Sequence, residues 1–574
     1  MMYLNKHNMI YMDKIFINAV IYTIDIKNRM YQAIGIKDGK IRALGTNDEV
    51  MMFAGTNTEI VDLNQNCILP GFVDPYSSIP EDLMLKNGVS LFNYNNIEDY
   101  IEIVSRYIKK NNNSNVIWCT GWRYEDEFRH KGEWINSIEC TKPIVAIDYN
   151  NEVILLNRYA VKYFNITPRR VPPIGGLIEI ELDESDREYA FLKGNAVNLV
   201  NTVSCYKMRD EDYEKAIIAY GKRLNSYGIT TVSIGNRELK EIPMELYRKI
   251  EDKNMLTVRT RCRIKILPSE ICKKTIYVQT HEIKRNRILY QSELFDISMG
   301  EIDVDGRLEV GLAYLFKTYR NVESHININK EYKGQFMWHM IEFIEAIKMA
   351  NRLDINMLIN ARGDYACKIA MDGIEYSARN NENHDYRNTI NHLDLITKYY
   401  IRRMKLLNTN ALIQPYWFFR ENSANYCAVS SIGEDRMHRL YPFKSIINEG
   451  IVTGASSDYY VRDKSNPIYA VWCAVCRNLY EFNNEGYPDK VNMNDSKYML
   501  NPGEKVTVLD AIKAMTINAA YILGMEKEIG SIELGKRADF IVVDYDIFKV
   551  HPMRIKDIKV NKTYLNGRLV YVNE

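Results

Sequence analysis

The chain has 574 residues, 46% of them hydrophobic, and its 75 basic and 74 acidic side chains leave a net charge of +1. This length allows a large core and more than one domain, whereas the balanced charge argues against the strong field by which nucleic-acid-binding and membrane-surface proteins attract their partners. No apolar run approaches the roughly 20 residues of a membrane-spanning helix, the N-terminal segment lacks a signal-peptide core, and the 10 scattered cysteines are typical of reduced thiols, so we expect a cytoplasmic protein.

The two ends of the chain show the same kind of pattern. Residues 14–68 alternate short β-branched runs with turns, and Asp38-Gly39 is typical of a tight hairpin turn. Residues 540–571 do the same, with Asn566-Gly567 as the turn. Two β-rich segments at opposite ends indicate one small sheet domain built from both termini.

The long middle of the chain, residues 70–525, alternates strand-like and helical segments. Residues 212–224 and 336–350 have the pattern of amphipathic helices, and a strand-like run follows each of them. Between residues 264 and 301 the pattern weakens, and we predict no element there. This repetition of strand and helix favours a parallel sheet or a (β/α) barrel.

Several segments, in order along nearly the whole chain, resemble those of the amidohydrolase superfamily. The most similar branch is the YtcJ-like one (amidohydrolase family 3), whose metal-dependent hydrolases include amide and formamide hydrolases. The segments are residues 69–74 (LPGFVD), 225–232 (NSYGITTV), 391–392 (NH), 414–415 (QP), 456–458 (SSD), 507–516 (TVLDAIKAMT) and 530–544 (GSIELGKRADFIVVD).

The resemblance implies an α/β fold with three parts. The first is a (β/α)8 TIM-type barrel, at residues 70–525. The second is an inserted α/β segment within it, at about 92–205. The third is a small β-sandwich domain made of residues 1–69 plus 526–574. The implied activity is hydrolysis of a non-peptide C–N bond in a small molecule.

The superfamily holds one or two divalent ions at the C-terminal mouth of the barrel, where the metal lowers the pKa of a bound water. Its ligands are a His-x-His pair, a carboxylated Lys or a Glu, two later histidines and an Asp. Here Tyr76 and Ser78 occupy the positions of the pair, and a phenol and a hydroxyl are poor zinc ligands. Asn360 replaces the first later histidine, and Arg362 adds a positive charge nearby.

Three residues are left as candidate ligands: Glu301, His392 and Asp458. Glu301 falls at the bridging carboxylate, although an exposed turn residue is an equal alternative. His392 keeps the position of the second later histidine, but the carboxylate before it has become Asn391. Asp458 keeps the position of the family's proton-shuttling Asp. The family's further histidine, in the insertion, falls at Glu152.

With three histidines replaced, we expect no tightly bound binuclear centre and no resident cofactor; a single divalent ion such as zinc is the alternative. We predict an atypical, metal-independent hydrolase in which His392 and Asp458 act as acid and base. Tyr76 would donate to an oxyanion, and Arg362 would hold a carboxylate. The residues expected to contact substrate are Tyr76, Ser78, Asn360, Arg362, Tyr459 and Glu152.

Two other functions stay open from the sequence. One is a non-catalytic relative that binds a small molecule or a partner protein. The other is a metal-free lyase or isomerase that uses the same two proton-transfer groups. In each case the expected partner is a small molecule, with no nucleic acid and no membrane. A homodimer is an open alternative to a monomer.

Overall fold

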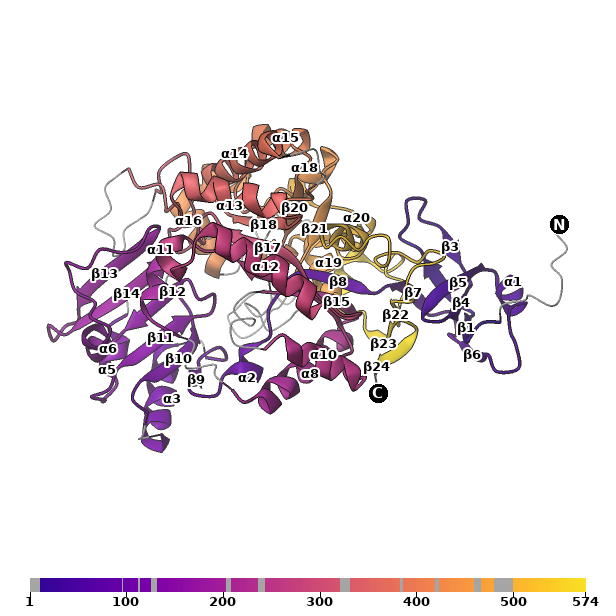
Figure 1. The fold of residues 1–574 in the computed structure, drawn as a ribbon, viewed down its shortest axis with the longest axis horizontal. Coiled ribbons are helices and arrows are strands. Elements are labelled where there is room, and N and C mark those ends of the chain that lie inside the picture. Colours follow the sequence, from indigo (N-terminus) through magenta and orange to yellow (C-terminus); the bar gives the residue numbers. More distant parts are fainter. Residues whose placement is uncertain are drawn as a thin grey trace.

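A computed structural model provides the three-dimensional structure. It describes residues 11–94, 96–111, 114–124, 132–202, 208–235, 243–320, 331–381, 386–418, 423–458, 466–478 and 499–573. The central body is a barrel, with a separate inserted sheet on one side and the sheets of the two chain ends on the other (Figure 1).

Eight strands form the barrel, and every neighbouring pair in it is parallel. The first and last strands are joined just beyond the last one, where the backbone N–H of Asp458 donates to the carbonyl of Tyr76 at 3.1 Å. The predicted α/β barrel is therefore confirmed. Its strands are β8 (Phe72–Ser77), β15 (Ile229–Ile234), β16 (Arg259–Lys265), β17 (Phe295–Asp303), β18 (Asn356–Ala361), β19 (Thr389–His392), β20 (Asn410–Ile413) and β21 (Thr453–Ala455).

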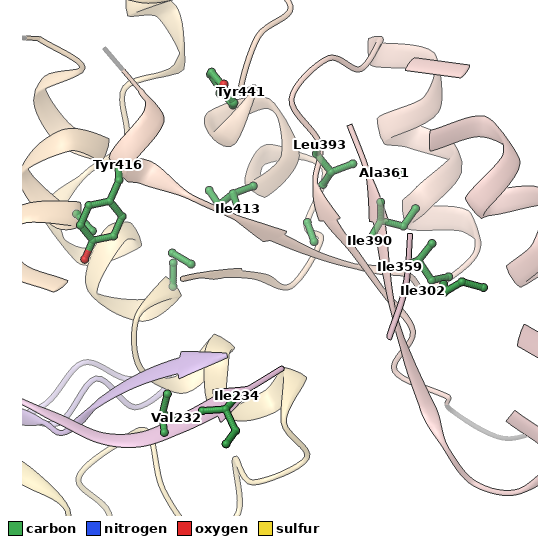
Figure 2. Close-up of a cluster of buried hydrophobic side chains, with 14 of the residues drawn as sticks. Val232, Ile234, Ile302, Ile359, Ala361, Ile390, Leu393, Ile413, Tyr416 and Tyr441 are labelled. Carbon is green, nitrogen blue, oxygen red and sulfur yellow. The ribbon is translucent and has the colours of Figure 1, made fainter. Parts of the chain in front are cut away.

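Apolar side chains on alternate positions of these strands pack outward against the helices. Figure 2 shows Val232 and Ile234 of β15, Ile302 of β17, Ile359 of β18 and Ile390 of β19 in one buried cluster. Since successive side chains of a strand point to opposite faces, the residues between them point into the barrel. That inner set is largely polar, and it forms the candidate site.

Helices cover the outside of the barrel, and helix α8 matches the helix predicted at residues 212–224. Within the described ranges, no helix has both the length and the apolar character needed to cross a bilayer. The main covering helices are α8 (Asp210–Ser226), α10 (Glu245–Asp252), α12 (Ile276–Tyr290), α13 (Met340–Arg352), α14 (Asp364–Asn380), α15 (Lys398–Leu406), α16 (Ser423–Ile432), α18 (Phe443–Asn448), α19 (Pro467–Cys476), α20 (Val508–Ala514) and α21 (Ile517–Ile522).

Two predictions for this region were wrong. Helix α13 begins at Met340 and not at residue 336, because the backbone N–H of Met337 donates to Val304 just after β17. Residues 264–301 contain the end of β16, the whole of helix α12 and most of strand β17. Their signal was weak because α12 buries the polar Gln279 and Thr280 while it exposes the apolar Ile288.

The inserted sheet has six strands. Its core includes Val310 and Leu312, which belong to the chain just after barrel strand β17. The insertion is thus anchored beside the C-terminal mouth of the barrel. Its strands are β9 (Val89–Ser90), β10 (Ile117–Trp122), β11 (Ile144–Asp148), β12 (Val153–Leu156), β13 (Gly176–Leu182) and β14 (Glu188–Gly194), and helices α3 (Ile97–Lys110), α5 (Trp134–Ser137) and α6 (Arg158–Tyr163) accompany them.

Strands from both ends of the chain meet in one six-stranded sheet, ordered β24-β23-β22-β7-β2-β3, beside a four-stranded sheet ordered β5-β4-β1-β6. Asp38-Gly39 and Asn566-Gly567 form the two predicted hairpin turns, and all four residues have positive φ angles. The strands are β1 (Lys14–Ile17), β2 (Val20–Tyr22), β3 (Met30–Tyr31), β4 (Ala33–Lys37), β5 (Lys40–Gly45), β6 (Glu59–Asp62), β7 (Cys67–Pro70), β22 (Phe540–Val543), β23 (Val560–Leu565) and β24 (Arg568–Val572).

Candidate functional site

Tyr76 enters the barrel through an irregularity in strand β8. Asp74 pairs with Val232 and Ser77 pairs with Ile234, so three residues of β8 span the length of two residues of β15. This bulge changes the side-chain alternation, and it places Tyr76 against the same apolar cluster as Val73. Of the two residues at the His-x-His positions, Tyr76 therefore points into the barrel interior. Ser78 lies one residue beyond the strand and is half-buried.

The guanidinium of Arg263, on strand β16, lies buried inside the barrel. It donates from Nε to Oε2 of Glu301 at 2.8 Å, and to the backbone carbonyls of Ser233 and Ser77 at 2.6 and 3.0 Å. Its carbon Cζ lies 4.0 Å from the ring centre of Tyr76, a cation–π contact. Arg263 thus binds groups from three other strands: β8, β15 and β17. Glu301 is buried in β17, so its interpretation as an exposed turn residue was wrong.

A chain of side-chain amides continues the network around the barrel. Asn360 donates to Oε1 of Glu301 at 3.0 Å and to Oδ1 of Asp303 at 2.7 Å. Asn391 donates to Oδ1 of Asn360 at 2.8 Å, and Gln414 donates to Oδ1 of Asn391 at 2.7 Å. Asn360 and Asn391 therefore each accept from the next amide along, which satisfies their buried carbonyl oxygens.

The network closes at the last strand. Gln414 also donates to Oγ of Ser456 at 3.0 Å, just after β21. Next to it, the backbone N–H of Ser457 donates to Oδ1 of Asp74 on β8 at 3.1 Å, and its hydroxyl also bonds this carboxylate. We call the resulting set the polar ring; its members are Arg263, Glu301, Asn360, Asn391, Gln414 and Ser456.

Asp74 is a fully buried carboxylate at this closure. Burial raises its pKa to about 6, against the opposing effect of its hydrogen bonds with Ser457. The hydroxyl of Ser77 lies 3.4 Å from that of Ser457 and 2.8 Å from that of Tyr220 on helix α8. Asp74 therefore holds the end of the last strand to the first one.

Arg362 lies at the end of strand β18 and is fixed by two carboxylates. Its backbone N–H donates to Asp305 at 2.9 Å, and its guanidinium donates to Asp394 at 3.1 Å. Asp305 also accepts from the N–H of Gly363 at 2.8 Å, where a Cβ would lie 2.1 Å from the carbonyl oxygen of Tyr314. This glycine permits the close approach that positions Arg362 beside the barrel mouth.

His392 ends strand β19 in a left-handed conformation, with φ of 74°. It is 3% exposed, and its Nδ1 has no hydrogen-bond partner among the described residues. Burial, and then the positive charge of Arg362, lower its pKa well below the usual range, whereas Gln414 acts in the opposite direction. The imidazole is therefore neutral at physiological pH.

Asp458 follows strand β21, also with a positive φ, of 51°. Its Oδ2 is buried and has no hydrogen-bond partner among the described residues. Burial raises its pKa, and the charges of Arg362 and Arg263 oppose this effect. His392 and Asp458 thus both respond to the charge of Arg362, and each presents an unpaired buried polar atom.

Glu152, from the inserted sheet, also acts on this region. Its Oε2 accepts from the backbone N–H of Arg307 at 2.8 Å. Its negative charge raises the pKa of Asp458. The insertion therefore contributes a charge that acts on Asp458. Tyr459, the other predicted contact, lies outside the described residues.

The donors at the family's metal positions are largely engaged with one another. Arg263 and Asn360 bind the two oxygens of Glu301, and the amide of Asn360 bonds to carboxylates and to Asn391. In the part of the chain that the structure describes, no three His, Cys, Asp or Glu side chains gather where they could hold a metal ion. A protein zinc site uses three or four such ligands, so these residues do not fit the metal centre that the resemblance implies.

Comparison with known proteins agrees with the barrel and its order of segments. The model of the amidohydrolase family matches residues 59–571. The chain belongs to the amidohydrolase family. Among its relatives, an N-substituted formamide deformylase of Arthrobacter pascens is 24% identical over 97% of this chain and 98% of that protein. The Bacillus subtilis protein YtcJ, named as an amidohydrolase, is 26% identical over 39% of each chain.

Among solved structures, an uncharacterized metal-dependent hydrolase from Pyrococcus horikoshii has a TM-score of 0.67 to this fold. It is 22% identical to this chain, and the match covers 94% of this chain and 99% of the other. At this identity the likeness shows that the two proteins share a fold. The assignment to amidohydrolase family 3 that the sequence motifs predicted is therefore confirmed.

Sequence reasoning missed Arg263 and the role of Gln414. A signal was present, because Arg259, Arg261, Arg263 and Lys265 occupy every second position of one segment. Four cations at a period of two on a strand place all of them on one face. In a barrel, one face of each strand is the interior, so this pattern predicts buried cations that need acidic partners.

Proposed function

We propose that this chain hydrolyses a non-peptide C–N bond of a small molecule at the C-terminal mouth of its barrel, by acid–base catalysis that needs no bound metal. Membership of the amidohydrolase family supports the reaction class. The formamide deformylase, which aligns over 97% of this chain, suggests N-substituted formamides and related small amides as the first substrates to test.

One observation carries the assignment of roles. The polar ring uses the hydrogen-bonding groups of Glu301, Asn360 and Asn391 within itself. In contrast, Nδ1 of His392 and Oδ2 of Asp458 are buried without a partner in the described residues. A buried polar atom without a partner destabilises the fold, so its retention here favours a bound molecule or water as the missing partner.

The proposed reaction uses these two groups in turn. Neutral His392 accepts a proton from a water that adds to the carbonyl carbon. In the proposed cycle Asp458, whose pKa is raised by burial, starts protonated and gives its proton to the leaving nitrogen as the C–N bond breaks. Transfer of a proton from His392 to Asp458 then restores both groups.

Tyr76 is proposed to stabilise the negative charge that develops on the carbonyl oxygen. Burial, and then the charges of Glu301 and Asp458, raise the pKa of its hydroxyl well above the usual range, so it stays a hydrogen-bond donor. Its contact with Oε1 of Glu301 is long, at 3.4 Å, so this donor can turn to a substrate oxygen at little cost.

The test is a screen of N-substituted formamides and small amides for amine release by the full chain, with and without prior treatment with a chelator. We expect His392→Gln and Asp458→Asn each to lower kcat by about a hundredfold or more. The exposed controls His339→Gln and Asp186→Asn should leave kcat unchanged. Chelation should leave turnover intact.

Four outcomes would contradict the proposal. Turnover that survives both substitutions would remove the acid–base assignment, and turnover lost on chelation would restore a metal mechanism. A compound that raises the melting temperature but is never turned over would favour a non-catalytic binding protein. A screened compound that loses a group by elimination, without uptake of water, would favour a lyase.

We also propose that the two terminal sheets form one β-sandwich domain, at residues 1–69 plus 526–574. What supports this is an apolar cluster with members from both sheets, among them Phe16 and Ile34 of the four-stranded sheet and Ile68 and Phe540 of the six-stranded one. Expression of residues 70–525 alone should then expose apolar surface and give an aggregating product.

A further inference from the structure

Strand β16 carries cations into the barrel, and they have different partners. Arg259, at the start of the strand, binds Asp539 of the terminal sheets at 2.5 Å. Arg263 binds Glu301 at 2.8 Å, and Lys265 forms an ion pair with Asp303. The strand therefore neutralises carboxylates along its length, and its middle cation, Arg263, is a member of the polar ring.

Arg263 is more deeply buried, and makes more hydrogen bonds, than an ordinary ion pair requires. It is 2% exposed, and its three nitrogen donors reach one carboxylate and two backbone carbonyls. The face of its guanidinium covers the ring of Tyr76. This planar, multi-donor binding suits arginine and not lysine, and it fixes the residue that occupies a His-x-His position.

The charge balance around Arg263 also opposes a divalent metal ion at Glu301. The two carboxylates at the C-terminal end of β17, Glu301 and Asp303, are matched by Arg263 and Lys265. A divalent ion bound by Glu301 would bring two further positive charges next to a buried guanidinium. Like charges in a desolvated interior repel strongly, and Oε2 of Glu301 would have to leave Arg263.

The field of Arg263 reaches the groups to which we assign the chemistry. Its positive charge lowers the pKa values of Asp458 and His392, and it lowers that of the Tyr76 hydroxyl. A fixed positive charge inside the mouth is also what a metal ion contributes in related enzymes. Here a side chain of the chain itself supplies that charge.

We infer that Arg263 is the internal cation of this barrel: its guanidinium bonds the carboxylate of Glu301, positions Tyr76, and excludes a divalent ion from this carboxylate. The inference deepens the proposed function and rests on it only for the statement that the reaction needs no ion. Arg263 is a positioning residue in this account, since it acts through Glu301 and Tyr76.

The test measures zinc binding and not activity. Histidines are restored at the family positions by Tyr76→His, Ser78→His and Asn360→His, once with Arg263 present and once with Arg263→Met. Zinc affinity is measured by competition with a chromophoric chelator, and zinc content by atomic emission after dialysis. We expect the protein that keeps Arg263 to bind zinc more weakly, by on the order of a hundredfold.

A matched control removes a cation from the same strand outside the polar ring. In the histidine-restored protein that keeps Arg263, adding Arg261→Met should leave zinc affinity as weak as it was before. Equal zinc affinity with and without Arg263 would overturn the inference. An equal increase in zinc affinity with Arg261→Met would also overturn the inference, because the loss of any positive charge on this strand would then have the same effect.

A second measurement does not require the restored histidines. Arg263→Met should lower the melting temperature, and adding Glu301→Gln should restore part of it, because the partner charge is then removed as well. A double variant that is no more stable than Arg263→Met would contradict the pairing. Wild-type protein that holds one zinc per chain, and loses it with Glu301→Gln, would refute the inference even if the proposed hydrolysis were confirmed.

Discussion

The ring of Tyr76 stands nearly perpendicular to the imidazole of His392, with an interplanar angle of 84° and ring centres 5.4 Å apart. The same tyrosine packs beneath the guanidinium of Arg263. Tyr76 thus contacts both the internal cation and the imidazole assigned as base. An aromatic edge contact of this kind also orients the ring it touches.

Two substitutions of Tyr76 test the role of its ring and the role of its hydroxyl separately. Tyr76→Phe keeps the contacts with His392 and Arg263, and its lost hydrogen bonds were long, at 3.4 and 3.5 Å. We therefore expect an almost unchanged melting temperature but a kcat lowered by about 10- to 1000-fold. Tyr76→Leu should lower both quantities. Wild-type turnover by Tyr76→Phe would remove the hydroxyl from the reaction.

His392 should remain neutral far below the pH at which an exposed histidine gains its proton. Because burial and the charge of Arg362 lower its pKa, the folded state binds fewer protons than the unfolded chain below pH about 6.5. Its contribution to stability is therefore lost as the pH falls through this range.

The measurement is a titration of imidazole ¹⁵N shifts by NMR, with His392→Gln to assign the signal. Arg362→Met removes a nearby positive charge and should raise the pKa of His392, while Arg106→Met, at an exposed ion pair with Glu102, should not change it. A histidine that titrates at its ordinary pH in the wild type would contradict the buried, Arg362-facing position.

The amides of the polar ring should depend on one another for their stability. Asn391→Leu leaves Oδ1 of Asn360 without its donor and Gln414 without one acceptor, so the free energy of unfolding should fall by about 2–4 kcal/mol. Adding Asn360→Leu removes the stranded acceptor, and the double variant should lose less than the sum of the single losses. Strict additivity in urea unfolding would show that the two amides do not interact.

Asp74 predicts a measurable pH dependence of stability. Its folded-state pKa of about 6 lies above the ordinary value of 3.8, so between these values the folded state binds more protons and stability falls as the pH rises. The whole difference corresponds to about 3 kcal/mol. Asp74→Asn removes the ionisable group. The substitution should therefore cost less free energy of unfolding at pH 7 than at pH 4, by about that amount.

Urea titrations at both pH values, on wild type and Asp74→Asn, give this difference. Asp13→Asn is a control whose effect should change little between these two pH values, since the hydrogen bond and charge of Lys37 lower the pKa of Asp13 below 3.8. If the difference in free energy of unfolding between wild type and Asp74→Asn does not change with pH, Asp74 is not buried in an apolar environment.

The order of the barrel and the identity of several site positions were predictable, because they depend on local patterns. Turn pairs such as Asp38-Gly39 determine their own geometry, and Asn360 and His392 were located by short segments that resemble family motifs. The partners within the barrel were not predictable, because which amide donates to which depends on the register of neighbouring strands. The bulge in β8 shows the limit: one extra residue decides that Tyr76 faces the barrel interior and Ser77 faces Tyr220.

The junction between barrel and terminal sheets should depend on one buried ion pair. Arg259 donates to Asp539 at 2.5 Å and to Asn566 at 3.0 Å, and neither Arg259 nor Asp539 has appreciable exposure. Arg259→Met leaves a buried carboxylate without its counter-ion, so the free energy of unfolding should fall by about 3–5 kcal/mol. Arg106→Met breaks an exposed pair with Glu102 and should lose less than about 1 kcal/mol.

Chemical unfolding followed by tryptophan fluorescence measures both losses. If Arg259→Met is accompanied by Asp539→Asn, the stranded charge is gone, and part of the lost stability should return. A loss of about 1 kcal/mol or less for Arg259→Met alone would mean that water reaches the pair. In that event the terminal sheets would be attached to the barrel mainly by apolar packing in the main core cluster, which includes Phe72 of β8 and Ile541 of β22.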